Sequence, residues 1–313
     1  MPSPSSITVV LGTGGTIAGT AAQATDGVGY RAAQIGVELL VAAVPALADV
    51  AIEVEQVSQV DSKNMSFAVW QTLARRIDSH LARAEVGGVV VTHGTDTLEE
   101  TAYFLQRVLA PARPVVLTAA MRPATSLQAD GPQNLLDAVL VAREPGAAGV
   151  CAVIGGDVFA AADLRKVHTY RLDAFSAGDA GLLGRIEEGR LRRFRAWPQG
   201  DALGLDRIDR APAGWPRVEI VTNHAGADGR IVDALLAQGL DGLVLAGTGN
   251  GSVSDALSAA ALRAQEAGVS VLRASRCAAG PVIGGDQSWL PGAGALSPAQ
   301  ARIELLLARL AAP

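Results

Sequence analysis

Short apolar segments alternate with longer amphipathic segments along most of the chain, and this pattern predicts β-strands that alternate with α-helices. Apolar runs predict strands at 7–11, 50–60, 88–92, 114–119 and 150–154. Apolar residues at helical spacing predict helices at 36–44, 67–81 and 98–109, with a further helix through 135–140. Because such alternation builds βαβ units, we expect a doubly wound, mostly parallel α/β sheet in this part of the chain.

The alternation stops near residue 157, and short hairpins are expected at 158–167 and 185–191. Glu188 and Gly189 suit the tight turn of the second hairpin. The segment 196–216 is rich in proline and glycine, which predicts a linker. A second region of the α/β type follows, with strands expected at 218–222, 242–246 and 269–274 and helices at 231–238, 255–267 and 298–310.

The predicted architecture is therefore a large N-terminal α/β domain at 1–195, a linker at 196–216 and a smaller C-terminal α/β domain at 217–313. The 313 residues, of which 49% are hydrophobic, are enough for two cores. A net charge of −5 without long runs of Lys or Arg argues against a nucleic-acid or anionic-membrane partner. No apolar run reaches the length of a membrane span, so we expect a soluble protein.

Two further observations concern the cellular compartment. Cys151 and Cys277 each lie in or beside an apolar segment, and we expect both to be buried free thiols. No charged and then apolar leader precedes Ile7, so the protein is expected to be cytosolic or already stripped of an export signal.

Thr16 follows the first predicted strand, in a turn that contains Gly14 and Gly15. A dinucleotide-binding turn would need a third glycine where Ile17 stands, so a nucleotide cofactor is not expected. A hydroxyl between glycines can act as a nucleophile, with bare backbone amides nearby to stabilise an oxyanion. The pattern alone is equally typical of a structural turn.

A second polar cluster, His93 to Thr97, follows the strand predicted at 88–92 and lies at the same edge of the sheet as Thr16. Thr95 beside Asp96 is typical of a second nucleophile or of a pair that orients water, whereas Asp96 or Thr97 could instead cap the next helix. No second His or Cys lies at ligand spacing from His93, so no metal site is expected.

Two other polar residues fit either a functional or a structural role. Lys166 lies among apolar neighbours and could act as a base, although the pattern also fits a surface lysine that extends into solvent. Asn250 lies in a glycine-rich loop after a buried strand, which suits ligand contact or a plain turn.

Four segments together resemble the bacterial L-asparaginase family, namely 13–19, 91–102, 119–123 and 249–251. The resemblance covers almost the whole chain in the same order, and the first two motifs are highly specific. It implies hydrolysis of the side-chain amide of L-asparagine, with release of ammonia, through an acyl-enzyme on a threonine. L-glutamine is a second possible substrate within this family.

The resemblance also assigns catalytic roles. Thr16 matches the nucleophile, and Tyr30 matches a tyrosine of a mobile loop that assists it. Thr95, Asp96 and Lys166 match a second threonine with its carboxylate and its lysine. The family needs no metal and no cofactor, so none is expected.

The remaining roles concern substrate binding and assembly. Ser62 and Asp96 match residues that hold the carboxylate and ammonium groups of the substrate. Asn250 matches a residue of the small domain that reaches the site of a neighbouring subunit. The family is typically a homotetramer with sites between paired subunits, and the resemblance implies the same assembly here.

This sequence departs from the family at two substrate-binding positions. Lys63 stands where related enzymes often have Gln or Glu, and Gln287 stands where the partner subunit usually supplies a glutamate. If the side chains of Lys63 and Gln287 both face the pocket, the ammonium group of the substrate lacks a negative partner and has a positive neighbour. This predicts weaker L-asparagine binding or another preferred amide. Alternatively, Lys63 points to solvent and Asp286 supplies the carboxylate.

Three functions therefore remain open: an L-asparaginase, a glutaminase-asparaginase or other small-amide amidase, and a non-catalytic amino-acid-binding protein. The segment 44–65 resembles the exported subtype of the family, but the cysteines that usually form a disulfide between 79 and 111 are missing. This favours a cytoplasmic protein, with a periplasmic one as the alternative.

Overall fold

The computed structural model describes residues 6–284 and 290–311. The chain divides into two compact units, 1–205 and 206–313, and this boundary falls inside the segment expected to be a linker. The domain limits 1–195 and 217–313 stay predictions. Within the described ranges, no helix combines the length and the apolar character needed to cross a membrane.

An eight-stranded sheet forms the centre of the first unit, within the residues that the structure describes. Its strand order is β10-β9-β6-β5-β4-β3-β1-β2. The parallel part consists of β1 (Ile7–Gly14), β2 (Ile52–Val60), β3 (Val86–Thr92), β4 (Val115–Thr118) and β5 (Val150–Ile154). The antiparallel part consists of β6 (Asp157–Ala160), β9 (Gly184–Glu187) and β10 (Arg190–Arg193).

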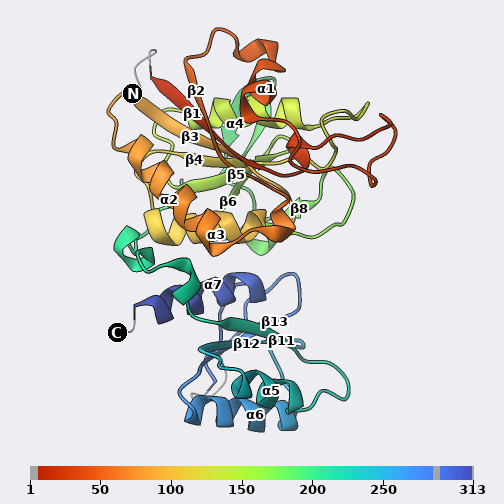
Figure 1. Ribbon diagram of the computed structural model, residues 1–313, viewed down its shortest axis with the longest axis vertical. Coiled ribbons are helices and arrows are strands. Elements are labelled where there is room, and N and C mark those ends of the chain that lie inside the picture. The colour runs from red at the N-terminus through yellow and green to blue at the C-terminus, as the bar shows by residue number, and fades with distance from the viewer. Residues whose placement is uncertain (1–5, 285–289, 312–313) are drawn as a thin grey trace. The chain divides into compact units, whose positions relative to one another are not determined.

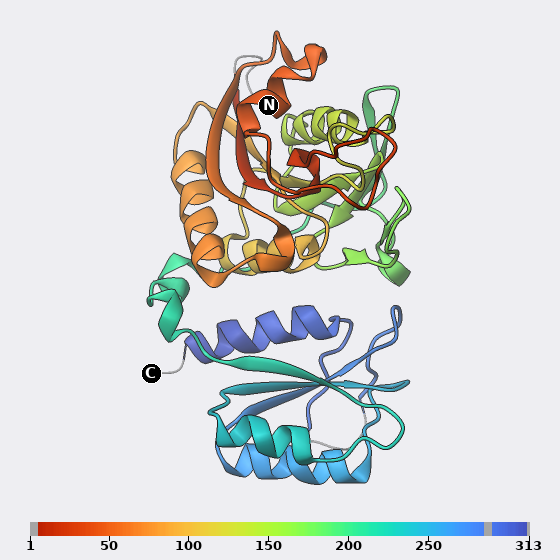
Figure 2. The same cartoon turned by 45° about the vertical axis from the view of Figure 1, so that its right-hand side comes forward.

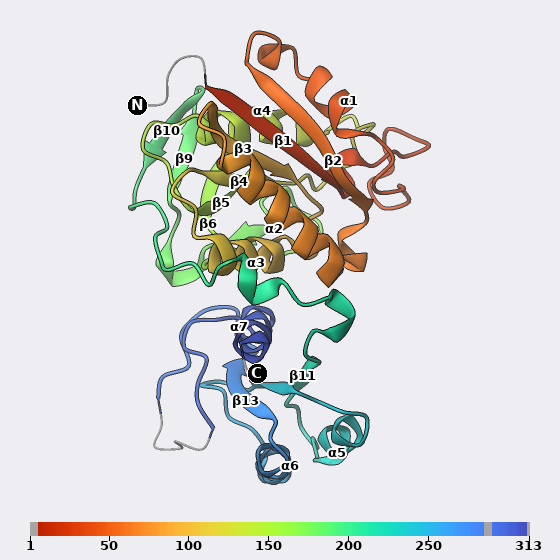
Figure 3. The same cartoon turned by 60° about the vertical axis from the view of Figure 1, so that its left-hand side comes forward.

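Helices cover both faces of this sheet, which confirms the doubly wound α/β prediction (Figure 1). The helices are α1 (Val37–Ala42), α2 (Phe67–Leu81), α3 (Leu98–Leu109) and α4 (Gly131–Ala142). One face packs against α1 and α4 and buries residues such as Val10, Val90 and Leu135. Figure 3 brings α2 and α3 to the front, where they lie side by side over the other face.

The strand order reverses between β1 and β3, because β1 leads to β2 on one side while β3, β4 and β5 follow on the other. At such a switch point the loops after the two strands diverge and leave room for a ligand at the carboxyl edge of the sheet. The loops after β1 and β3 carry Thr16 and Thr95. The topology thus places both predicted nucleophile turns next to each other at the carboxyl edge of the sheet.

One predicted hairpin is confirmed and the other is wrong. Glu188 and Gly189 have φ angles of 48° and 69° and make the expected tight turn between β9 and β10. The segment 158–167 is not a hairpin, because β6 pairs back onto β5 after Gly155 and Gly156 turn the chain with positive φ. The end of that segment, β7 (Arg165–Lys166), instead pairs with β8 (Phe175–Ser176).

The second unit has a parallel three-stranded sheet, within the residues described, with α5 and α6 on one face and α7 on the other (Figure 2). Its elements are β11 (Val218–Thr222), β12 (Gly242–Gly247), β13 (Ser270–Ser275), α5 (Arg230–Ala237), α6 (Asp255–Glu266) and α7 (Pro298–Leu310). The smaller α/β domain predicted from the sequence is therefore present. Ser297 caps α7 in a capping box with Gln300.

The two cysteines have different environments. Cys151 is buried in β5, and burial raises the pKa of its thiol to about 12. Cys277 is exposed, so the prediction that it is buried was wrong. It lies in the turn after β13 ends at Ser275, beyond the apolar strand beside which it was expected to be covered.

Candidate active site

The turns after β1 and β3 touch through their glycines. Gly15 has φ 83° and ψ −173°, a conformation that only glycine adopts readily. A Cβ atom on Gly15 would collide with the backbone of Gly94, and a Cβ on Gly94 would lie 2.8 Å from the Cβ of Ser62. Because Thr16 and Thr95 each follow one of these glycines, the close approach brings the two threonines to one place.

Thr16 begins a short 3-10 helix, Thr16–Ala18, and its side chain is almost fully buried. Its hydroxyl lies 2.6 Å from the hydroxyl of Tyr30, at hydrogen-bond distance. Tyr30 reaches this position from a loop whose ends are joined by two backbone hydrogen bonds between Thr20 and Arg31, of 2.9 and 2.8 Å. The pair can therefore exchange a proton without rearrangement of either side chain.

Thr95 forms a second hydroxyl cluster with Lys166 and Asp96. The Nζ of Lys166 donates to Thr95 Oγ1 at 2.8 Å and to Asp96 Oδ1 at 2.7 Å. The Lys166 side chain is 19% exposed and that of Asp96 is 53% exposed, so the carboxylate faces solvent while the lysine is largely covered. A threonine hydroxyl, an amine and a carboxylate in direct contact can relay protons.

Glu99 fixes the backbone of Lys166, a role that the sequence did not predict. Its Oε2 accepts the backbone N–H of Lys166 at 2.7 Å. Burial raises the pKa of the Glu99 carboxyl, against the opposing effects of the Lys166 N–H and of the positive charges of Arg165 and Lys166. From the sequence, Glu99 was interpreted only as an acidic residue in the first turn of a helix, where it is favourable. That pattern gives no indication that its carboxylate bonds Lys166.

Ser62 joins the two strand ends from the side of β2. It is buried, and its Oγ accepts the backbone N–H of Asp96 at 3.2 Å. Thr97 stands at the N-cap position of α3, but its hydroxyl donates to the carbonyl of Ser62 at 2.9 Å, and neither Thr97 nor Asp96 caps the helix through its side chain. The alternative in which the side chain of Asp96 or Thr97 caps the helix is therefore wrong, because the hydroxyl of Thr97 bonds Ser62 instead.

Backbone amides are available at the same place. Among the residues that the structure describes, the N–H groups of Thr16 and Thr95 have no hydrogen-bond partner, whereas the N–H of Gly15 donates to Val60 and that of Asp96 to Ser62. Unpaired amides beside a buried hydroxyl can stabilise the negative oxygen that forms when the hydroxyl attacks a carbonyl.

His93 is part of the scaffold. Trp70 Nε1 donates to Thr101 Oγ1 at 2.8 Å, and this hydroxyl lies 2.9 Å from His93 Nε2. Because the carbonyl of Gly94 can only accept, we assign the ring proton to His93 Nδ1, which donates to this carbonyl at 2.7 Å, and Nε2 then accepts the Thr101 hydroxyl proton. Burial lowers the pKa of His93 to about 4, so the ring is neutral and fixes the Gly94 turn.

Lys63 does not contact the two hydroxyl clusters through a hydrogen bond. Its side chain is 66% exposed, and its Nζ forms an ion pair with Asp61 at 2.9 Å. The hydrogen bond with Asp61 raises the pKa of Lys63, and the charges of Asp61, Asp96 and Tyr30 act in the same direction. Lys63 therefore points toward solvent but keeps its positive charge within electrostatic reach of Asp96.

The other predicted binding residues lie in the second unit. Both ends of the Asn250 side-chain amide bond to the backbone of Ile283, with Nδ2 donating at 2.9 Å and Oδ1 accepting at 2.7 Å. In this chain Asn250 thus fastens its loop to the segment at 283. Gln287 and Asp286, the two candidates for the usual glutamate, lie outside the described residues.

The described residues contain no group of three or more His, Cys, Asp or Glu side chains arranged to hold a metal ion. The expected independence from metals and cofactors stays a prediction. The chemistry that the arrangement can carry is proton transfer and nucleophilic attack by a threonine hydroxyl.

Known proteins resemble this chain over nearly its whole length. Residues 8–199 match the family Asparaginase, N-terminal, and residues 217–311 match the Glutaminase/Asparaginase C-terminal domain. "L-asparaginase 2" of Bacillus subtilis (strain 168) is 37% identical over 309 residues, 96% of this chain and 81% of that protein. "Glutaminase-asparaginase" of Pseudomonas fluorescens biotype A is 36% identical over 278 residues, 88% of this chain and 76% of that protein. The crystal structure of the "Probable Cytoplasmic L-asparaginase" from Campylobacter jejuni matches with a TM-score of 0.91 and 36% identity, over 97% of this chain and 94% of that one.

Proposed function

This chain belongs to the asparaginase family, and on that premise we propose that it hydrolyses the side-chain amide of L-asparagine to L-aspartate and ammonia. One observation carries the proposal beyond the resemblance. Two threonine hydroxyls stand at the switch point of the sheet, and each has its own proton-exchange partner, Tyr30 for Thr16 and Lys166 for Thr95. An amide is a poor electrophile, and a site that activates both the nucleophile and the leaving group suits it.

In the first half of the proposed reaction, Thr16 attacks the amide carbon. Its hydroxyl proton passes to the Tyr30 oxygen as the C–O bond forms, while Tyr30 gives up its own hydroxyl proton toward the amide nitrogen. The backbone N–H groups of Thr16 and Thr95 stabilise the negative oxygen. The C–N bond then breaks, and the nitrogen leaves as ammonia with the proton that Tyr30 gave up. The substrate side chain remains as an ester on Thr16.

In the second half, water replaces ammonia. As the water attacks the ester carbon, the Thr95 oxygen takes a proton from the water, Thr95 passes its own hydroxyl proton to Lys166 Nζ, and Lys166 gives one of its protons to the Asp96 carboxylate. The C–O bond to Thr16 then breaks, the cluster returns a proton to the Thr16 oxygen, and L-aspartate forms. The two clusters thus divide the work, one for the nucleophile and one for the water.

Substrate recognition is assigned to Ser62 and Asp96. Of the two Asp96 carboxylate oxygens, only Oδ1 bonds Lys166 Nζ, so Oδ2 of this half-exposed carboxylate can accept from the ammonium group of an amino acid. Ser62 Oγ accepts the N–H of Asp96, which leaves its hydroxyl proton to donate to the substrate's carboxylate. Lys63 adds a positive charge near the ammonium end, which predicts weaker L-asparagine binding than with a neutral residue there.

We also propose that the chain forms a homotetramer in which a second copy completes each site with Asn250 and with Gln287 or Asp286. The motif match of Asn250 supports this assignment. Light scattering measures the assembly.

Replacing Gln287 with Glu distinguishes the two candidate residues, since a clear gain in asparagine turnover supports a lost acid at position 287. No change, together with inactivation by Asp286→Asn, overturns the Gln287 assignment.

Ammonia release from L-asparagine, L-glutamine and D-asparagine tests the function. We expect L-asparagine to be hydrolysed fastest, and we expect Thr95→Val to abolish most of the activity while Thr72→Val, on the exposed side of α2, leaves it unchanged. Equal rates with L-glutamine would make the protein a glutaminase-asparaginase. Stabilisation by these amino acids without any ammonia release would make it a binding protein and end the enzymatic proposal.

A cytoplasmic location is proposed on two grounds, the missing cysteine pair and the similarity to a protein named as cytoplasmic. Fractionation of the native host by osmotic shock, followed by detection of the chain in each fraction, tests it. Release with the periplasmic fraction contradicts this location.

A further inference from the structure

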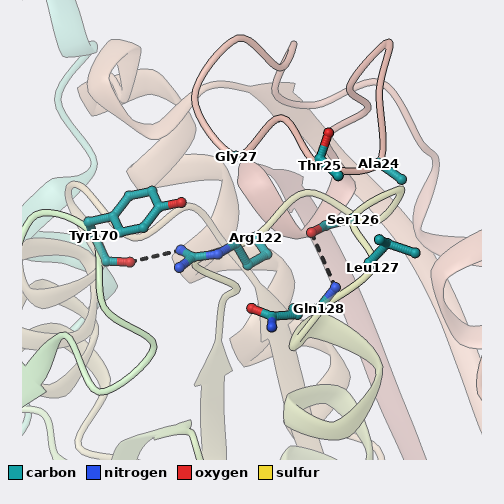
Figure 4. A pocket seen from close by; sticks show the side chains of 8 residues that line it. All are labelled: Ala24, Thr25, Gly27, Arg122, Ser126, Leu127, Gln128 and Tyr170. Atoms are coloured by element: carbon teal, nitrogen blue, oxygen red, sulfur yellow. Dashed lines mark hydrogen bonds between the residues drawn. The ribbon is translucent and has the colours of Figure 1, made fainter.

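A pocket of about 230 Å³ lies in the first unit, outside the contacts of the two hydroxyl clusters (Figure 4). One wall comes from the loop that carries Tyr30 and includes Thr25 and Gly27, and another comes from the loop at 121–130, which follows β4. Sites for drug-sized ligands measure about 300 to 1,000 Å³, so this pocket suits a smaller molecule.

The two loops are joined to each other without any ligand. Two backbone hydrogen bonds connect them, Ala124 N to Gly19 O at 3.0 Å and Leu127 N to Ala24 O at 3.1 Å. Thr125 Oγ1 adds two more, as it accepts Ala21 N at 2.8 Å and donates to Ala21 O at 3.4 Å. The pocket is therefore formed in advance, and a ligand does not have to order its walls before it binds.

Arg122 lies in the middle of the pocket, between Tyr170 on one side and the turn of Ser126 and Gln128 on the other (Figure 4). Its guanidinium lies over the Tyr170 ring, with the Cζ atom 4.0 Å from the ring centre. One nitrogen, Nη1, donates to the carbonyls of Tyr170 at 2.8 Å and Met121 at 3.3 Å.

The other donors of Arg122 are unused. Among the residues described, Nε and Nη2 have no hydrogen-bond partner, and no carboxylate forms an ion pair with this guanidinium. Asp130 is near in sequence, but its two oxygens accept the backbone N–H groups of Met121 and Arg122, each at 2.9 Å. Because the Tyr170 ring and the two carbonyls bonded to Nη1 hold the guanidinium, its Nε and Nη2 donors are held in place and remain open to a ligand.

The free Nε and Nη2 donors of Arg122 determine which class of ligand fits the pocket. Parallel N–H groups on Nε and Nη2 match the two oxygens of a carboxylate, and Arg122 is the only cationic side chain among the lining residues. A single positive charge suits a single negative one, whereas phosphate carries more charge than one arginine balances. Ser126 Oγ accepts Gln128 N at 3.3 Å and keeps its proton to donate, while Leu127 and Ala24 offer apolar contact.

We propose that this pocket binds a small organic monocarboxylate with a short alkyl chain, held by the Nε and Nη2 edge of Arg122. The bound acid also contacts the loop that carries Tyr30, because Thr25 and Gly27 line the same space. A Cβ on Gly27 would lie 3.2 Å from the Tyr170 hydroxyl, so the loop is already close to the stacked pair. Occupancy is therefore expected to hold this loop in place.

Sodium propionate is the test ligand, added to the full-length protein at constant ionic strength with sodium chloride as the balance. Saturation-transfer difference NMR measures its dissociation constant, and hydrogen–deuterium exchange measures protection of the loop at 21–29. We expect propionate to bind and to slow exchange in that loop. Arg122→Gln should weaken binding at least about tenfold and remove the protection.

Three variants make the result specific. Tyr170→Phe keeps the stacked ring and should leave binding unchanged, because the Tyr170 hydroxyl makes no hydrogen bond within the described residues. Arg122→Lys keeps the charge without the paired N–H groups, so it should also weaken binding, even if Arg122→Gln unfolds the loop. Ser62→Ala alters the proposed substrate site and should leave propionate binding intact.

Each contrary result overturns the assignment. Equal dissociation constants for the wild type and both Arg122 variants would remove the arginine from the site. Loss of propionate binding in Ser62→Ala would place the acid at the hydroxyl clusters, and inorganic phosphate binding more tightly than propionate would exclude a monocarboxylate site. None of these readouts depends on turnover, so the carboxylate site and the proposed amidase activity can fail separately.

Discussion

His93 makes the stability of the first unit depend on pH in a window that can be calculated. The folded protein holds the imidazole neutral between Thr101 and Gly94, and burial lowers its pKa from 6.5 to about 4. The unfolded chain takes up a proton near pH 6.5, whereas the folded protein does so only near pH 4. The stabilising contribution is thus complete above pH 6.5 and is lost as the pH falls toward 4.

The size of the effect follows from the gap between the two values. Each pH unit of the gap changes the free energy of unfolding by about 1.4 kcal/mol for one proton. Acidification from pH 7 to pH 4 therefore costs about 3 kcal/mol from His93 alone. This is a large share of the roughly 5 to 15 kcal/mol that stabilises a typical domain.

Urea unfolding, followed by tryptophan fluorescence between pH 7.5 and 4.5, measures this dependence. Trp70 belongs to the same hydrogen-bond chain, so its emission reports on the region around His93. The test variant is His93→Asn, whose amide can still donate to Gly94 but does not titrate. His224→Gln, at an exposed position, is the matched control.

We expect His93→Asn to be less stable at pH 7.5 but to lose less stability on acidification than the wild type. Near pH 5 the slopes of the two proteins should differ by close to one proton, about 1.4 kcal/mol per pH unit. His224→Gln should follow the wild type. Parallel curves for wild type and His93→Asn would refute the view that His93 stays neutral in the folded protein.

Three more predictions concern the residues around the two hydroxyl clusters. Glu99→Ala should lower kcat about 10- to 100-fold because Lys166 loses the acceptor of its backbone N–H. Glu99→Gln can still accept this N–H and should retain most of the wild-type kcat. Equal losses of kcat in the two variants would contradict this role. Tyr30→Phe should lower kcat about 10²- to 10⁴-fold with little change in KM, as measured by ammonia release, and unchanged kcat would remove Tyr30 from the proton path. Gly15→Ala should reduce the free energy of unfolding by more than about 2 kcal/mol. Gly146 also has a positive φ but has open space around it, so Gly146→Ala should reduce the free energy of unfolding by less. Equal losses in urea titrations would argue against the collision with Gly94.

The sequence pattern was most informative where apolar strands end in polar turns. The strands before Thr16 and Thr95 are continuous apolar runs, and strands of that kind end at the carboxyl edge of a parallel sheet. The switch point itself could not be read from the pattern, because periodicity identifies strands but not their order. The sheet order β2-β1-β3 supplies that information and explains why these two turns meet.

Residues in irregular segments were the hardest to place. Tyr30 lies in a loop without periodicity, and only the family resemblance singled it out before its contact with Thr16 was seen. The pattern around Lys166 fitted a surface lysine, because the pairing of β7 with β8 that aims it at Thr95 is only two residues long. Glu99 could not be predicted, since its partner lies 67 positions away in the chain.

The central claim is that the Thr16 hydroxyl becomes acylated during turnover. The measurement is the ratio of aspartic β-hydroxamate to aspartate formed at a fixed concentration of hydroxylamine, from L-asparagine and from L-aspartate β-methyl ester. A shared ester on Thr16 predicts the same ratio from both substrates, and neither product from Thr16→Ala. Different ratios from the two substrates, or turnover by Thr16→Ala near the wild-type rate, would contradict the account.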